Sequence, residues 1–252
     1  MVIWVDSASL LHLVSASSRL TIYSSHCRFA ARRNSGVMRL QQDPLMDAAR
    51  AEELLNHLAD IVDLPPYDES DRLLLSHTLA VTSLHFAASV RTLCREDMML
   101  GAGAALRSQF EALVRSIWTY YRATDLQIEK LSSLLSIESQ QSNKNIPQVA
   151  EMIGELGKLS QLQNLLVSLK EFKDSSWQPL NSFVHAGIHA VHWTRWAAPP
   201  RLLDQTFRSS NGLAVLAFQN LAILTGHPTL QCEVIAACAS FSSCLPAYRV
   251  SA

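Results

Sequence analysis

The chain has 252 residues, 48% hydrophobic and 17% charged, and a net charge of −1. This length allows one large domain with a sizeable core. The balanced charge excludes a chain-wide attraction to nucleic acid or anionic membranes, although local basic patches remain compatible with it. The chain contains only 8 glycines and 9 prolines, which favours helices.

Residues 1–42 differ from the rest of the chain, because they are rich in serine and arginine and contain one acidic residue, Asp6. They show no helical or strand period. Two interpretations are open: an Arg/Ser-rich leader of the transit type, or an incorrectly assigned start, with translation beginning at Met38 or Met46. We favour the second, since a regular helical pattern begins at Met46. The expected organisation is a disordered leader or incorrect start at 1–45, an all-α domain at 46–245 and a tail at 246–252.

Helical periodicity continues from residue 47 to about residue 241. Capping residues, prolines and glycines divide it into segments. The expected helices span 47–62, 70–95, 98–123, 126–137, 147–158, 160–172, 180–196, 203–225 and 229–241, with Pro147 and Pro179 opening two of them. No segment alternates like a strand. The sequence therefore predicts an all-α bundle of about seven to nine helices.

The cysteines do not form a recognisable framework. There are five, no Cys-x-x-Cys pair occurs, and the last three are six residues apart. This pattern favours reduced thiols used as small core residues over disulfides or a zinc knuckle. No run reaches the roughly 20 apolar residues of a membrane span. We expect a cytoplasmic protein without membrane contact.

The segment 98–123 carries charged residues beside its apolar face. Arg107, Glu111 and Arg115 recur every four residues, so they form a ladder on one side of the helix. The ladder is either a solvated set of ion pairs or an anion site in which Glu111 holds two guanidiniums. Trp118 on the same side favours a pocket. The small residues from Gly101 to Gly103 predict close helix approach, because no lysine follows them to form a phosphate loop.

The expected helix 180–196 places Asn181, His185, His189 and His192 within about 80° of arc. Three interpretations are open: a metal site using His185 and His189, acid–base catalysis, or packing of structural histidines. No zincin glutamate and no third ligand are indicated, so we expect no metal and no cofactor. Gly187 in mid-helix predicts a tight helix crossing.

Two segments, LRSQFEALVRSIWTYY (106–121) and LNSFVHAGIHAVHW (180–193), resemble a bacterial family of uncharacterised helical proteins. That family is distantly similar to HEPN domains of toxin–antitoxin and abortive-infection systems. The resemblance implies an all-α bundle, often dimeric. It also implies RNA cleavage without metal by an arginine, a polar residue and a histidine. Asn181 and His185 match the last two, but no arginine lies five to seven residues before His185. Arg107 or Arg115 is the expected replacement; Arg72, five residues before His77, is a weak second match.

The leading hypothesis is therefore a HEPN-like, metal-independent RNA-acting toxin or phage-defence component. In it, His185 is the general acid or base, Asn181 orients it, and Arg107 and Arg115, organised by Glu111, stabilise phosphate charge. The expected partners are RNA, a cognate antitoxin protein and a second copy of the chain. One alternative is a catalytically inert helical interaction or dimerisation module. Another is a small-molecule-binding bundle walled by Trp118, Tyr120 and Trp193.

Overall fold

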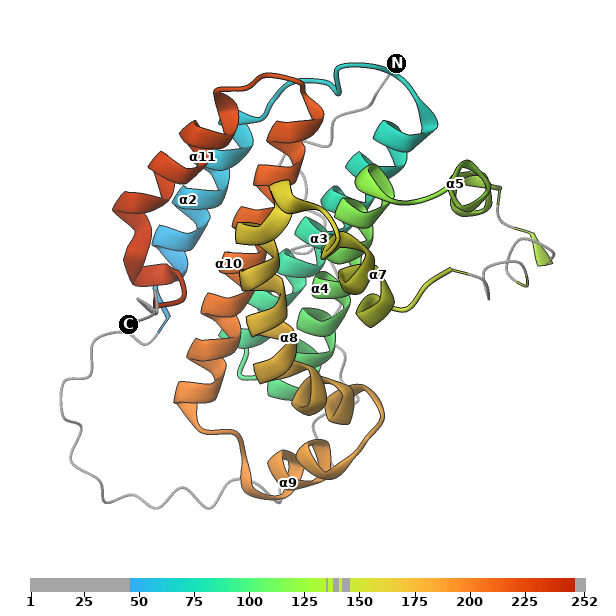
Figure 1. Ribbon diagram of the computed structural model, residues 1–252. Coiled ribbons are helices and arrows are strands. Elements are labelled where there is room, and N and C mark those ends of the chain that lie inside the picture. The colour runs from blue at the N-terminus through green and yellow to red at the C-terminus, as the bar shows by residue number, and fades with distance from the viewer. Residues whose placement is uncertain (1–45, 135, 138–140, 142–145, 248–252) are drawn as a thin grey trace.

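The computed structural model describes residues 46–134, 136–137, 141 and 146–247 (Figure 1). These residues form nine α-helices, two short 3-10 helices and no strand, so the all-α prediction is confirmed. The predictions for Cys27, for the leader at 1–45 and for most of the tail lie outside the described residues. The elements are α2 (Ala48–Ile61), α3 (Asp71–Arg95), α4 (Met99–Tyr121), α5 (Asp125–Ser132), α7 (Val149–Leu156), η3 (Ser160–Leu162), α8 (Gln163–Val184), α9 (Ile188–Trp196), α10 (Pro200–Leu224), α11 (Leu230–Cys238) and η4 (Ala239–Cys244).

Helix α4 is the centre of the bundle and packs against α3, α7, α8 and α10. Its apolar face is fully buried, because it is covered by helices on several sides; the residues include Phe110, Leu113, Val114, Ile117 and Trp118. Figure 1 shows α2 and α11 side by side along α10, and α9 at the end of the bundle beyond α8. The core therefore forms around α3, α4 and α10, and α8 closes one side of it.

Two buried polar layers join these three central helices. In the first, the Ser76 and Ser116 hydroxyls each donate to the other residue's carbonyl oxygen, at 2.9 and 2.6 Å, and the Asn220 amide donates to the Ser116 hydroxyl. In the second layer the Ser83 hydroxyl donates to the Gln109 carbonyl oxygen. The Gln109 side-chain amide donates to the Ser210 carbonyl oxygen and accepts from the Ser210 hydroxyl. Buried polar groups are costly unless they are hydrogen-bonded, so these layers fix the alignment of the three helices.

Arg72 holds the end of α4 in place. Its guanidinium donates to the carbonyl oxygens of Thr119 and Ala123, at 2.9 and 2.7 Å, and pairs with Asp125 at 3.0 Å. The last carbonyls of a helix have no partner within the helix, so an arginine is well suited to them. Arg72 therefore has a structural role, and this accounts for the arginine of the weak Arg72–His77 match.

The prediction of one helix from 180 to 196 is wrong. Helix α8 passes through Pro179 without a break and ends at Val184, and α9 begins at Ile188. Between them Ala186 has a φ of 51°, and the Gly187 N–H donates to the carbonyl oxygen of Ser182 at 2.7 Å. This is the helix ending in which a left-handed residue closes the last turn. Pro179 is tolerated because the surrounding turns of α8 are packed against α4.

Gly187 is required at this turn because of its contact with Ser182. The prediction that it marks a tight helix crossing is wrong. A side-chain carbon at this position would lie 2.7 Å from the hydroxyl oxygen of Ser182. That hydroxyl accepts a hydrogen bond from the His189 N–H at 2.9 Å, at the start of α9. The glycine therefore leaves room for the serine that caps the next helix.

The predicted close helix approach at Gly103 is confirmed. A side-chain carbon built there would lie 2.5 Å from a ring carbon of Phe183 on α8. We expect Gly103→Ala to destabilise the protein by about 1–2 kcal/mol, because overpacking outweighs the gain in helix propensity. Urea denaturation measures the change in the free energy of unfolding.

The matched control is Gly154→Ala on α7, where nothing lies within 4 Å of the added carbon. This substitution is expected to leave stability unchanged or to raise it by up to about 1 kcal/mol. Equal changes in the free energy of unfolding in Gly103→Ala and Gly154→Ala would contradict close packing of α4 against α8.

The described cysteines are free thiols, and Cys94 and Cys244 are buried. Burial raises the pKa of the Cys94 thiol to about 12, which makes it unreactive. The prediction that the cysteines are reduced core residues is confirmed for Cys94 and Cys244, whereas Cys232 is exposed.

Helix α3 is long and apolar enough to cross a membrane by length and composition alone. This is weak evidence for a span, because the core helices of soluble bundles pass the same test. In this structure α3 packs against α4 and α10, and its two buried serines bond to α4. The apolar residues of α3 therefore have a role in the bundle core.

Candidate site between helices α4 and α8

Helices α4 and α8 run antiparallel along their contact. The Phe110 ring lies 4.6 Å from Phe172 and 6.0 Å from Trp177, whereas Phe183, further along α8, lies against Gly103 at the start of α4. The C-terminal end of α8 therefore meets the N-terminal half of α4. The segment 106–121 therefore starts opposite Trp177, whereas Phe183 of the segment 180–193 lies nearer the start of α4, at Gly103.

Arg107 is held on two sides in this contact. Its guanidinium donates to Glu111 at 2.9 Å and lies 4.9 Å from the centre of the Trp177 ring. The side chains of Arg107 and Glu111 are 19% and 31% exposed, so the pair is only partly open to solvent. An ion pair and an aromatic face together fix the orientation of the guanidinium. The Nε atom of Arg107 is buried without a hydrogen-bond partner among the described residues.

Asn181 and His185 continue from Trp177 at intervals of four residues, which places them on the same side of α8. The His185 N–H donates to the Asn181 carbonyl oxygen at 3.0 Å, so His185 closes the last turn. Its side chain is exposed, while Asn181 is half-buried and its Oδ1 has no hydrogen-bond partner in the part of the chain that the structure describes. By helix rise, Asn181 and His185 lie about 6 and 12 Å beyond Trp177 along α8.

Arg115 does not join this group. It lies eight residues beyond Arg107, about 12 Å along α4 and away from the end of α8 that carries His185. Among the described residues no ion pair joins it to Glu111, so only half of the predicted ladder forms. The Arg115 Nε is buried without a partner among those residues.

Trp118 does not line a pocket, so that prediction is wrong. The side chain is fully buried, and its indole N–H donates to Glu155 on α7 at 2.6 Å. Trp118 lies near the C-terminal end of α4, whereas Trp193 lies on α9, beyond the opposite end. The small-molecule pocket walled by Trp118, Tyr120 and Trp193 is therefore not formed.

The four polar residues expected on one helical face are divided between two helices. His189 lies on α9, half-buried, with its ring 6.3 Å from Phe183 in an edge-to-face contact. His192 is exposed, and its ring lies 4.5 Å from Trp193. Both lie on α9, after the turn at Ala186, whereas Asn181 lies on α8 and His185 follows its last residue. Among the described residues, no group of three histidine, cysteine or acidic side chains could hold a metal ion.

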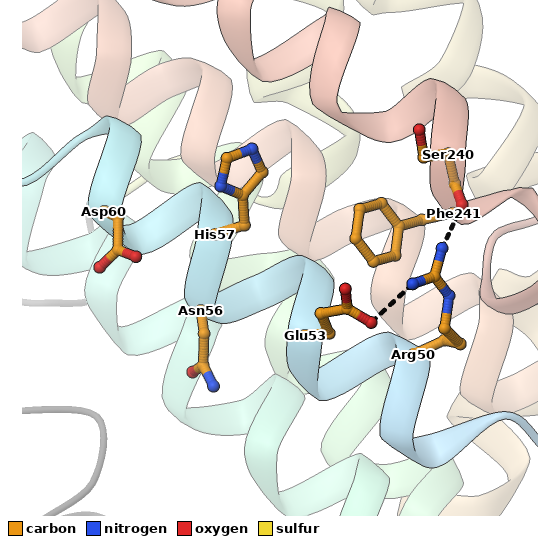
Figure 2. A pocket seen from close by; sticks show the side chains of 7 residues that line it. All are labelled: Arg50, Glu53, Asn56, His57, Asp60, Ser240 and Phe241. Carbon is orange, nitrogen blue, oxygen red and sulfur yellow. Dashed lines mark hydrogen bonds and ion pairs between the residues drawn. The ribbon is translucent and has the colours of Figure 1, made fainter.

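A surface hollow of about 530 Å³ lies elsewhere, between α2 and η4 (Figure 2). Arg50 is fully engaged in it: it donates to Glu53 and to the Ser240 carbonyl oxygen, both at 2.6 Å, and lies over the Phe241 ring. In Figure 2 the His57 side chain points away from Arg50. These contacts hold η4 against α2, and none of the predicted site residues takes part.

The structure thus shows an all-helical protein in which the Arg107–Glu111 ion pair lies in the α4–α8 contact, and Asn181 and the exposed His185 follow at the end of α8. The chain belongs to DUF6988, a family of unknown function, which it matches over residues 80–247. This range includes all four residues. No curated protein and no solved structure matches the chain, so no named relative links it to HEPN domains.

Proposed function

We propose that this protein is a HEPN-like, metal-independent ribonuclease that acts as a toxin or phage-defence component in the cytoplasm. Its site consists of Arg107, Glu111, Asn181 and His185. One observation carries the proposal: the Arg107 guanidinium lies over Trp177, one helical turn before Asn181 and two before His185. In this proposal Arg107 of α4 takes the role of the arginine that is absent from the turn before His185.

The chemistry follows from these residue types. The exposed His185 imidazole takes the proton of an RNA 2′-hydroxyl. The 2′-oxygen then bonds to phosphorus while the bond to the 5′-oxygen breaks, and that oxygen takes a proton from water. Arg107 stabilises the added charge on the phosphate, and Glu111 fixes its orientation. Asn181 orients the imidazole or the phosphate.

Growth on induced expression tests the proposal. We expect the wild type to arrest growth and Arg107→Ala to relieve the arrest, because it removes the phosphate-binding guanidinium. Arg115→Ala is the matched control, since Arg115 is the same residue type on the same helix outside the site. The comparison is made at equal soluble protein levels. Absence of arrest by the wild type, or equal arrest by wild type and Arg107→Ala, would contradict the proposal.

A second candidate function is the inert interaction or dimerisation module. It is favoured by large apolar side chains exposed around the end of α8 and on α9; they are Val184, Ile188, Val191 and Trp196. Exposed apolar patches of this kind mark contact surfaces. In that case the wild type does not arrest growth, and a second copy or an antitoxin protein covers the patch.

A further inference from the structure

The segment from the end of α8 through α9 contains no acidic residue. Between Asp174 and Asp204 the chain has Arg195, Arg201 and three histidines, but neither aspartate nor glutamate. The chain as a whole is nearly neutral, so this region is a local departure from its charge balance. A polyanion meets no carboxylate repulsion from this stretch.

Helix α9 also presents aromatic surface to solvent. Trp196 is 63% exposed, and the Arg195 guanidinium lies 4.8 Å from the centre of its ring. One turn earlier, the exposed His192 contacts Trp193, which is half-buried. A flat ring with a cation beside it, left open at a helix end, offers both stacking and charge to a ligand.

The position of α9 relates this surface to the proposed site. Ile188, its first residue, comes three residues after His185. His189 packs against Phe183, which in turn lies against Gly103 of α4, so α9 is held at the end of the α4–α8 contact. Figure 1 shows α9 at this end of the bundle, beyond the last turn of α8.

We infer that α9 is a stacking platform for unpaired bases, which makes single-stranded RNA the substrate class of the adjoining site; this inference rests on the proposed function. Bases stack on Trp196, and Arg195 and Arg201 contact phosphates. Duplex RNA keeps its base faces covered and gains only the charge contacts. A lipid surface or a second copy of the chain would contact Ile188 and Val191. Neither of these two partners requires a guanidinium placed over a tryptophan ring, as Arg195 is over Trp196.

The test measures binding of a fluorescent oligouridine of about twelve nucleotides, within the site sizes of such proteins. The full chain carries His185→Ala, so that cleavage is slow compared with the binding measurement. We expect Trp196→Ala to weaken binding by about tenfold, in line with the loss of one stacked base. Leu126→Ala is the matched control, because Leu126 is 60% exposed and belongs to α5, which lies well apart from α9 in Figure 1. Far-UV circular dichroism checks that both variants fold.

Four outcomes would overturn the inference. If Trp196→Ala binds as tightly as its parent while the wild type still cleaves RNA, α9 is not the platform and the proposed function survives. If the wild type neither binds nor cleaves RNA, both the stacking inference and the proposed ribonuclease function are wrong. If Trp196→Ala leaves RNA affinity unchanged but abolishes self-association or binding to anionic vesicles, α9 is an interface of another kind. Equal affinity for single-stranded and duplex RNA would likewise contradict base stacking.

Discussion

Replacing His185 with alanine is expected to lower the rate of RNA cleavage by a factor of about 10²–10⁴, the usual contribution of a general acid or base. The imidazole is exposed at the end of α8, so its removal leaves no cavity and stability stays close to that of the wild type. Initial rates on a labelled single-stranded RNA measure the effect.

His57→Ala is the control for this substitution. His57 is an exposed histidine on α2, in the hollow between α2 and η4, and is expected to be dispensable. A His185→Ala rate within a few-fold of the wild type, or an equal loss in both variants, would rule out His185 as the catalytic base.

Replacing Phe110 with alanine is expected to lower the free energy of unfolding by about 3–5 kcal/mol. Phe110 is fully buried, and its ring contacts Phe172 and Trp177, so truncation leaves a cavity in the α4–α8 contact. Because Trp177 supports the Arg107 guanidinium, the proposed RNA cleavage is expected to fall as well. Urea denaturation measures the change in stability.

The exposed Leu126 provides the comparison for this variant, since Leu126→Ala is expected to change stability by no more than about 0.5 kcal/mol. A loss below about 1 kcal/mol in Phe110→Ala would mean that α8 does not pack against α4 as described.

The sequence is a good guide to helices with clear ends. The segment predicted over 47–62 is Ala48–Ile61 in the structure, because Asp47 caps it and a proline pair follows. Helix α10 begins at Pro200, three residues before the predicted start at residue 203, because a proline is well suited to the first helical position. Pro179 was misleading, since proline usually marks a helix start, whereas here packing against α4 keeps it inside α8. Tertiary contacts of this kind leave no trace in local sequence.

The candidate site could be predicted only where local spacing determines it. The four-residue interval between Arg107 and Glu111 led directly to their ion pair. The partner of Arg107 across the helices, Trp177, was missed, although its four-residue interval to Asn181 is a usable signal. Buried layers such as Ser76 with Ser116 depend on the alignment of distant helices, and no local pattern in the sequence indicates them.

The most direct measurement is incubation of the purified wild-type chain with single-stranded RNA in excess EDTA, followed by analysis of the new RNA ends. Attack by the 2′-oxygen predicts cleavage without metal and fragments that end in a 2′,3′-cyclic phosphate. RNA that stays intact at protein concentrations equal to those of the RNA would contradict a ribonuclease built on Arg107 and His185.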